Sequence, residues 1–546
     1  MKNLVIFTIF VILLSTYYTF SQKINLKYDN GNHELFDNYK DLLYRLDDSL
    51  KILKNDGFVL AEVDKFNKID SLSYSVKIKK YSQFELIKLD PYEGYFAESV
   101  NKILGKYFQN DKKIKLNSLN GLLKNISDFF SSQGFPFAEI NITYSKIINS
   151  KTILGKLKIK SNEVRKIDSY IFKGYEKFPK KFTEKFLRIK IGEKLDIKKL
   201  KNSSNYINSL QFVRQIKEPE ILFTKDSTFI YFYYEKLKQN NFDGLITLSS
   251  GESNNQISID GYLKLFLLNS LNYGESIKID YNSIDESFKI LKTNFKLPFI
   301  FNSDLSIESS LNITQKDSLY NSSNFLFKGG LERRKISNYL GLSLENSTSE
   351  FSNNIYENFK SFQIFYELNY QLFKNDKNSH NKIFSISAKF SLGHKEQLNK
   401  RFTKNNFDID IFKKTNLFQK TSLVSKIRYE SLVSENIVNN EMIRFGGAES
   451  IRGFIDESIS TNEYFLLRNN INIMLNKNFS LLGIIDYANY KNDIVNRMKN
   501  IYSLGFGFKL LNNDNLISLN YASGSDFNQK FSFKNARLNI NFISFF

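Results

Sequence analysis

The residues best suited to chemistry form a glycine-rich segment with one arginine, together with one aspartate further along the chain. Gly446 and Gly447 precede the tetrad Ile451-Arg452-Gly453-Phe454, and Asp486 lies in a later alternating segment. A buried guanidinium needs a carboxylate that accepts two hydrogen bonds, and glycine lets a loop backbone lie close to a wall. These residue types suit a loop whose backbone lies close to a wall. The alternative is a surface loop whose Arg452 faces solvent.

Other reactive side chains are scarce. The chain has no Cys, which excludes disulfides, thiolate metal sites and cysteine nucleophiles. Its three His, at positions 33, 380 and 394, are scattered singly. We therefore expect no metal, no cofactor and no Cys-based or His-based catalytic residues.

The N-terminus indicates export. Lys2 precedes an apolar run from Leu4 to Leu14, and small residues at Thr19 and Ser21 fit a cleavage site before Gln22. Residues 1–21 are expected to be a signal peptide, with an uncleaved membrane anchor as the alternative. The chain of 546 residues carries 77 Lys and Arg against 57 Asp and Glu, an excess of +20. Export argues against nucleic acid as the partner of this charge, and leaves acidic lipid or acidic protein segments.

The loop motif lies within a long region of alternating residues. From Asn241 onward, segments of alternating polar and apolar residues are separated by Asn, Asp, Ser and Gly clusters, for example 256–268, 361–373 and 382–393. Such segments are typical of transmembrane β-barrels, and residues 239–546 hold about sixteen of them. A soluble β-sandwich or β-helix is the alternative, which the length and even spacing of the segments disfavour.

The N-terminal half contains a repeat. A helical pattern over 35–53 ends at Gly57-Phe58, a second ends at Gly134-Phe135, and a further step of 77 residues (134 − 57 = 77; 135 + 77 = 212) leads to Phe212. Helix C-caps explain each glycine locally, but not the equal spacing. We expect three α+β modules over 22–81, 82–160 and 161–238, each with a strand, two helical segments and two strands.

These features together resemble the BamA/TamA outer-membrane assembly superfamily, in which POTRA modules precede a barrel with the bacterial surface antigen architecture. The tetrad 451–454 fills the four positions of the family's inward-folded loop motif, and Asp486 matches its acidic partner. Ile484 and Ala488 depart from the family's Phe and Gly around that acid. Segments 505–509 and 519–524 fall where the family's last strands carry Gly-x-Gly and an aromatic-Ala pair. The resemblance covers essentially the whole mature chain.

The resemblance implies a non-enzymatic machine in the bacterial outer membrane, with its N-terminal modules in the periplasm. Its partners would be the lipid bilayer, unfolded outer-membrane or secreted protein clients, and accessory periplasmic or lipoprotein subunits, with no nucleic acid. Three modules are closest in layout to TamA, which favours insertion of client proteins. Two-partner secretion of a dedicated exoprotein is the alternative, although no proline-rich plug linker follows residue 22. A passive channel or receptor is a second alternative.

Two further features concern the ends of the barrel. The first strand, near Leu245, and the last, near Ile540, are expected to form a weak lateral seam where a client strand can pair. At the C-terminus one strand face carries apolar residues and resembles the assembly signal of outer-membrane barrels. These residues are Leu538, Ile540, Phe542 and Phe546.

Overall fold

The computed structural model describes residues 23–250, 257–285, 288–316, 319–350, 355–376, 379–512, 514–528 and 530–546. The expected signal peptide, residues 1–21, lies outside them. The chain divides into two compact units, Met1–Lys166 with Lys194–Lys198, and Ile167–Glu193 with Lys199–Phe546. Among the described residues, no helix is both long and apolar enough to cross a membrane.

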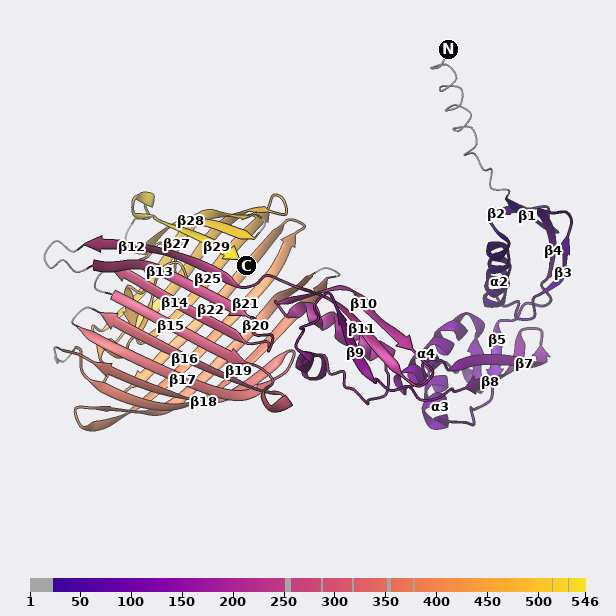
Figure 1. Cartoon of the computed structure of the whole chain (residues 1–546), viewed down its shortest axis with the longest axis horizontal. Coiled ribbons are helices and arrows are strands. Elements are labelled where there is room, and N and C mark those ends of the chain that lie inside the picture. Colours follow the sequence, from indigo (N-terminus) through magenta and orange to yellow (C-terminus); the bar gives the residue numbers. More distant parts are fainter. Residues whose placement is uncertain are drawn as a thin grey trace, which may run out of the picture. The chain divides into compact units, whose positions relative to one another are not determined.

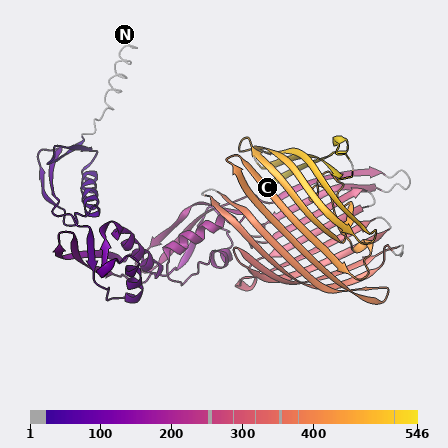
Figure 2. The ribbon, with the colours of Figure 1, turned by 180° about the vertical axis from the view of Figure 1, so that it is seen from behind.

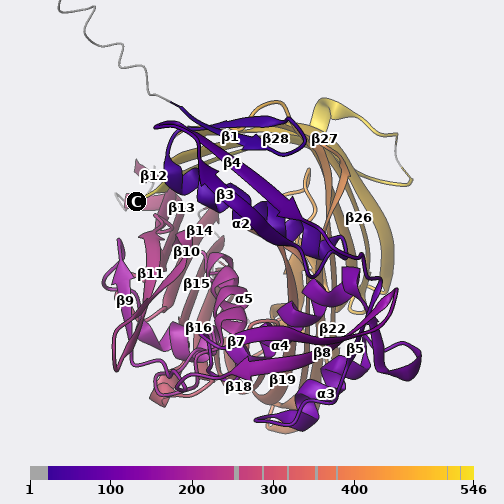
Figure 3. The same cartoon turned by 90° about the vertical axis from the view of Figure 1, so that its right-hand side faces the viewer.

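The first unit begins with a four-stranded sheet in the order β2-β1-β4-β3. Its strands are β1 (Ile24–Tyr28), β2 (His33–Phe36), β3 (Glu62–Lys68) and β4 (Ser73–Lys79). Helix α2 (Tyr39–Asn55) lies along this sheet (Figure 3). It buries Leu42 and Leu46 in a cluster that includes Leu26. The helix begins later than residue 35, because Asn38 caps it by accepting a hydrogen bond from the Asp41 amide at 2.9 Å. Leu35 instead lies in β2, so this described sheet carries one α-helix where two helical segments were expected.

The same unit contains a second sheet, in the order β6-β5-β8-β7. Its strands are β5 (Leu86–Leu89), β6 (Lys113–Lys115), β7 (Glu139–Asn149) and β8 (Thr152–Lys160), and its helices are α3 (Ala97–Gly105) and α4 (Leu119–Ser132). Leu122, Ile126 and Phe130 recur along one face of α4 and are fully buried. Gly134, with φ +92°, follows the helix in the left-handed conformation that glycine adopts without strain.

The second unit begins with a three-stranded sheet in the order β10-β11-β9. It comprises β9 (Ser169–Lys173), β10 (Val213–Phe223) and β11 (Thr228–Lys236), with three short helical segments, η3 (Phe182–Phe186), α5 (Ile197–Ser204) and η4 (Asn205–Ser209). These three sheets fall within the ranges expected for the three modules. The domain boundaries themselves stay a prediction.

The third sheet is docked on turns of the barrel through polar contacts. Arg188 pairs with Asp304 through two hydrogen bonds of 3.0 and 2.7 Å. Arg334 donates to the backbone oxygens of Phe186 and Leu187. These contacts attach the helical segments of the third module to the barrel.

Tyr175 joins the same interface. Its hydroxyl donates to Asn272 at 2.8 Å and accepts from Asn269 at 2.7 Å. Burial raises the pKa of Tyr175 above its ordinary value, so the hydroxyl remains a donor well above neutral pH.

Within the described residues, sixteen antiparallel strands close into a barrel in chain order, with the last strand beside the first (Figures 1 and 2). This confirms the expected barrel and its approximate strand number. The strands are β12 (Asn241–Ser250), β13 (Ile257–Leu268), β14 (Ser276–Asp285), β15 (Phe288–Leu297), β16 (Leu305–Lys316), β17 (Tyr320–Glu332), β18 (Ile336–Thr348), β19 (Phe359–Asp376), β20 (Ser379–Gln397), β21 (Lys400–Phe418), β22 (Thr421–Ser434), β25 (Glu463–Met474), β26 (Phe479–Asn492), β27 (Arg497–Asn512), β28 (Asn515–Asp526) and β29 (Arg537–Phe545).

Strand alternation separates the two faces of the wall. On β19, Phe362, Ile364 and Tyr366 are exposed, whereas Ser361 and Gln363 are buried. Because successive side chains of a strand point to opposite faces, the apolar set covers the outside and the polar set lines the lumen. An apolar exterior on a closed sixteen-stranded barrel indicates the outer membrane.

Candidate functional site

The candidate site is a hairpin that folds inward between β22 and β25, which we call the inward loop (residues 435–462). Its arms, β23 (Ile443–Phe445) and β24 (Ile459–Thr461), pair antiparallel, so the middle of the loop is a short two-stranded hairpin. A short 3₁₀ turn, η6 (Asn439–Glu441), precedes the first arm. The Gly446–Phe454 segment lies at the tip of this hairpin.

The inward loop crosses the lumen, because it contacts strands from separate parts of the wall. Arg444 donates to the hydroxyl of Tyr320 on β17 at 3.1 Å. Glu449 pairs with Lys264 on β13 at 3.3 Å, and Glu457 pairs with Lys292 on β15 at 3.2 Å. On the other side of the loop, Arg452 reaches β26, so the loop obstructs the lumen.

Arg452 and Asp486 form a buried ion pair at the tip of the loop. Arg452 Nε donates to Asp486 Oδ2 at 2.7 Å, and a second guanidinium nitrogen donates to Oδ1 at 2.5 Å. The backbone amide of Arg452 also donates to Oδ2, at 3.2 Å. Arg452 is 3% exposed and Asp486 1%, so this is the two-point contact that a desolvated guanidinium requires. Arg452 does not face solvent.

Two residues of β25 also hold the tip of the loop, and the sequence analysis did not single them out. Asn470 on β25 accepts from Arg452 through its side-chain oxygen at 2.5 Å. Arg468, on the same strand, donates to the backbone oxygens of Ala448 and Glu449 at 2.9 and 2.6 Å. Arg468 lies directly opposite Asp486 in the β25–β26 register, and the alternation of the single segments does not contain this register.

The glycines of the motif meet backbone and ring atoms that leave no room for a side chain. Gly446 and Gly447 have φ of +124° and +86°. A Cβ on Gly453 would lie 2.4 Å from the Gly524 amide nitrogen, and one on Gly524 would lie 2.2 Å from a Phe454 ring carbon. Gly524 on β28 therefore provides the space for Phe454. The alternating pattern of β28 concealed this role.

The departures from the family's acidic motif have a packing reason. Ala488 is fully buried in one cluster with Ile451, Tyr464 and Ile501. Its methyl group fills space beside the tetrad where glycine would leave a gap. Ile484, on the same face of β26, is buried as well.

The barrel seam is short in the described residues. Only two residue pairs join the first and last strands, Asn241 with Phe545 and Phe242 with Ser544, and the Phe546 amide donates to the Asn240 carbonyl at 2.9 Å. The neighbouring strands β12 and β13 pair over the full length Asn241–Ser250. Leu245 and Ile540 lie beyond the paired end, so the structure does not pair these two positions. Much of both edges is left without a partner strand.

The C-terminal apolar residues share the outer face. Leu538, Ile540, Phe542 and Phe546 are each more than half exposed, and β29 places the first three opposite Tyr521, Leu519 and Ile517 of β28. Their role as an assembly signal stays a prediction. No group of three or more His, Cys, Asp or Glu suited to a metal ion lies in the part of the chain that the structure describes.

Comparisons with known proteins agree with this architecture. Residues 321–510 match the family model described as haemolysin secretion/activation protein ShlB/FhaC/HecB. This segment contains the inward loop and both members of the Arg452–Asp486 pair. The comparison with curated protein sequences found no match.

Solved structures with a similar fold include two CdiB proteins. CdiB from Escherichia coli matches with a TM-score of 0.52 at 11% identity, over 93% of this chain and 98% of that one. CdiB from Acinetobacter baumannii matches with a TM-score of 0.50 at 13% identity, over 92% of this chain and 96% of that one. At these identities the likeness shows that the fold is shared.

Proposed function

We propose that this chain is a two-partner secretion transporter of the outer membrane, which exports a dedicated protein partner without enzymatic chemistry. The observation that carries the proposal is the match of residues 321–510 to a family model described as haemolysin secretion/activation. The likeness in fold to CdiB is consistent with it. The proposal replaces insertion of many clients, which we expected first from the resemblance to TamA, with the alternative of a dedicated client.

In this proposal the three N-terminal sheets act as periplasmic POTRA-like modules that receive the unfolded client. An open sheet edge can pair with an extended chain through backbone hydrogen bonds, without requiring a fixed side-chain sequence. The inward loop closes the lumen at rest and moves when the client passes. Accessory periplasmic or lipoprotein subunits are compatible with this role.

One observation favours outer-membrane protein insertion as a second candidate function. The seam joins β12 and β29 through two residue pairs in the described region, and unpaired strand edges can template an incoming strand. Passive conduction, in contrast, gives no reason for a buried Arg452–Asp486 pair to hold a loop across the lumen.

The deciding experiment is depletion of the protein followed by an inventory of outer-membrane and secreted proteins. Loss of one secreted protein, with other barrels unchanged, supports the proposed secretion. A broad loss of outer-membrane barrels would show insertion instead. Unchanged inventories would contradict both functions and favour a channel.

A further inference from the structure

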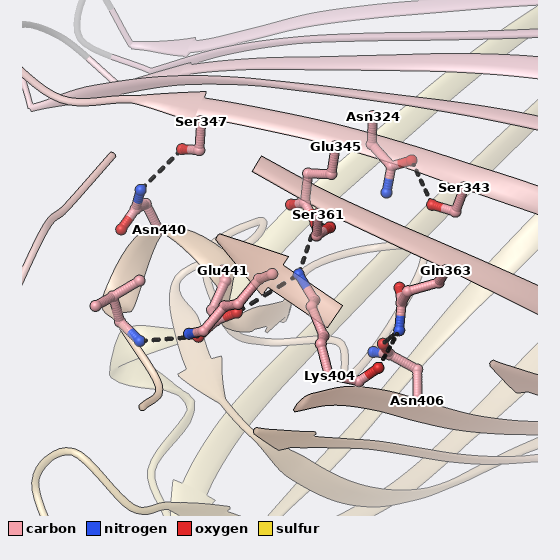
Figure 4. A network of polar contacts seen from close by, with 12 residues as sticks. Asn324, Ser343, Glu345, Ser347, Ser361, Gln363, Lys404, Asn406, Asn440 and Glu441 are labelled. Atoms are coloured by element: carbon pink, nitrogen blue, oxygen red, sulfur yellow. Dashed lines mark hydrogen bonds and ion pairs between the residues drawn. The ribbon is translucent and has the colours of Figure 1, made fainter. Parts of the chain in front are cut away.

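The inward loop is also held at its base, by a cluster of three buried charges and one half-buried charge that the Arg452–Asp486 contact does not include. Glu441, in the turn η6, pairs with Lys395 on β20, and both side chains are fully buried. The second oxygen of Glu441 lies 3.5 Å from Nζ of Lys404 on β21, and Lys404 pairs with Glu345 on β18 at 2.6 Å. Two ammonium groups and two carboxylates thus balance in one site, and Figure 4 shows Glu345, Lys404 and Glu441 of this set.

Asn440 binds the same region of the wall through neutral hydrogen bonds. Its side-chain nitrogen donates to Ser347 Oγ on β18 and to the backbone oxygen of Glu357, both at 2.8 Å (Figure 4). Gln363 on β19 donates to the backbone oxygen of Lys404 at 3.0 Å and so supports the strand that presents Lys404. Every member of the base contact therefore has a partner on another element.

The two contacts lie on different strands. The base of the loop is bound by β18, β20 and β21. The tip is bound by β25 and β26 through Asn470 and Asp486, and its flanks also pair with Lys264 on β13 and Lys292 on β15. Between the two contacts the loop is a paired hairpin, so the base and the tip contact different residues. Release of the tip alone would leave the loop attached at its base.

We propose that Glu441 and Asn440, with Lys395, Lys404 and Glu345, form a second and independent anchor that positions the inward loop across the lumen. These are positioning residues, because they act through the loop and not on the client. The inference rests on the proposed function insofar as a passing client needs the loop to move. In this arrangement the lumen opens fully only when both anchors are released.

The test is single-channel recording of the full-length protein in planar lipid bilayers, with potassium chloride as the current carrier. Glu441→Gln keeps the shape of the side chain and removes its charge, which leaves two ammonium groups facing one carboxylate. We expect the ratio of open to closed time to rise about tenfold, which corresponds to the loss of about 1.4 kcal/mol of holding free energy. The double variant Glu441→Gln/Arg452→Ala should show the product of the two single effects, because independent contacts add in free energy.

Three further variants complete the design. Asn440→Ala removes the two hydrogen bonds that the Asn440 side chain donates and the one, at 3.4 Å, that it accepts from the Glu357 amide. It leaves all four charges in place, so it tests the anchor even where Glu441→Gln fails to fold. Glu441→Gln/Lys404→Met changes two members of one anchor and should show less than the product of its single effects. Glu435→Gln is the matched control, because Glu435 lies at the same end of the loop and its contact with Thr403 is exposed.

The second anchor is overturned if folded Glu441→Gln keeps the wild-type ratio of open to closed time. Where Glu441→Gln does not fold, the wild-type ratio in Asn440→Ala overturns it. A Glu441→Gln/Arg452→Ala ratio equal to that of Arg452→Ala alone overturns its independence. Barrel folding is verified by the shift in gel migration between heated and unheated samples. The recordings require no client protein, so their outcome and the outcome of the depletion experiment are separable.

Discussion

At the scale of single residues, the inward loop depends on one charge pair and on one space left by a missing side chain. Arg452 is held by a carboxylate, a side-chain amide and a backbone contact. Its neighbour Phe454 occupies the space beside Gly524. The first contact supplies directional hydrogen bonds, whereas the second is purely steric, and the two make different predictions.

For the charge pair, we expect Arg452→Ala and Asp486→Ala each to weaken secretion, and the double variant to be no worse than the worse single one. Breaking a buried pair by removing one partner leaves the other charge without compensation, which costs about 3 to 5 kcal/mol. Export of the client measured in the four variants of a double-mutant cycle provides the check. Strictly additive losses would show that the two residues act separately.

For the steric contact, Gly524→Ala should displace the Phe454 ring. The free energy of unfolding of the barrel with its inward loop should fall by about 1 to 3 kcal/mol, as it does when a core is overpacked. The effect is measured as the temperature at which half of the protein loses the gel migration of the folded barrel. In a Phe454→Ala background the same change should have little effect, because the clash is gone. Gly329→Ala is the control, since a Cβ there meets its nearest neighbours only at 3.9 Å.

At the scale of elements, residue pattern predicted the strands better than it predicted their tertiary partners. The alternating segments 361–373 and 382–393 lie within β19 and β20 as expected, because a wall with one apolar face imposes a period of two. Arg452 and Asp486 were expected to meet, and the structure places them in contact. Lys395 and Lys404 gave no signal, because a lysine in an alternating strand looks the same whether its lumenal partner is water or a buried glutamate.

Prediction of helix boundaries and of the seam was limited for a related reason. The apolar spacing of residues 35–53 fits a helix from its first residue, yet pairing of β2 with β1 takes Leu35 into the sheet. The alternation near Leu245 and Ile540 likewise identifies strands but not the point where their pairing ends. Register is set by contacts between distant segments, which local spacing does not contain.

The seam yields a prediction based on its register. Phe242→Cys and Ser544→Cys occupy paired positions, and opposite Cα atoms in antiparallel strands lie about 4.5 to 5.5 Å apart, within the range of a disulfide. If lateral opening is needed, oxidation should stop activity while the barrel stays folded, and reduction should restore it. The chain has no native Cys to interfere.

The matched control for the seam is a disulfide in a long ladder. Leu368→Cys and Ala388→Cys lie opposite each other in the middle of the β19–β20 pairing. A bond there should leave activity unchanged, because these strands are already joined along their length. Full activity of the oxidised seam variant would exclude lateral opening and favour passage through the lumen.

At the scale of the whole molecule, the first compact unit holds two of the three N-terminal sheets, and the second holds the third sheet together with the barrel. The second sheet of the first unit has its own core around Leu122, Ile126 and Phe130, whereas the third sheet belongs to the barrel unit and binds its turns. The contacts of Arg188 and Arg334 therefore keep the third sheet with the barrel when the first unit is removed.

Deletion of residues 23–160 should abolish export of the client and leave a folded barrel with the single-channel conductance of the full-length protein. The physical reason is that the deleted sheets carry the open edges proposed to receive the client, whereas the loop and its anchors lie in the other unit. Export assays and bilayer recordings on the same variant make the comparison. Retained export would assign client reception to the third sheet alone.

The contacts of the inward loop also join the two halves of the barrel. The base of the loop binds wall residues that precede it in the chain, such as Ser347, Lys395 and Lys404. The tip binds Asp486, and Phe454 lies against Gly524 on the penultimate strand, both of which follow the loop. The loop is therefore an internal brace between early and late strands, which the hydrogen bonds of the wall join only between neighbours.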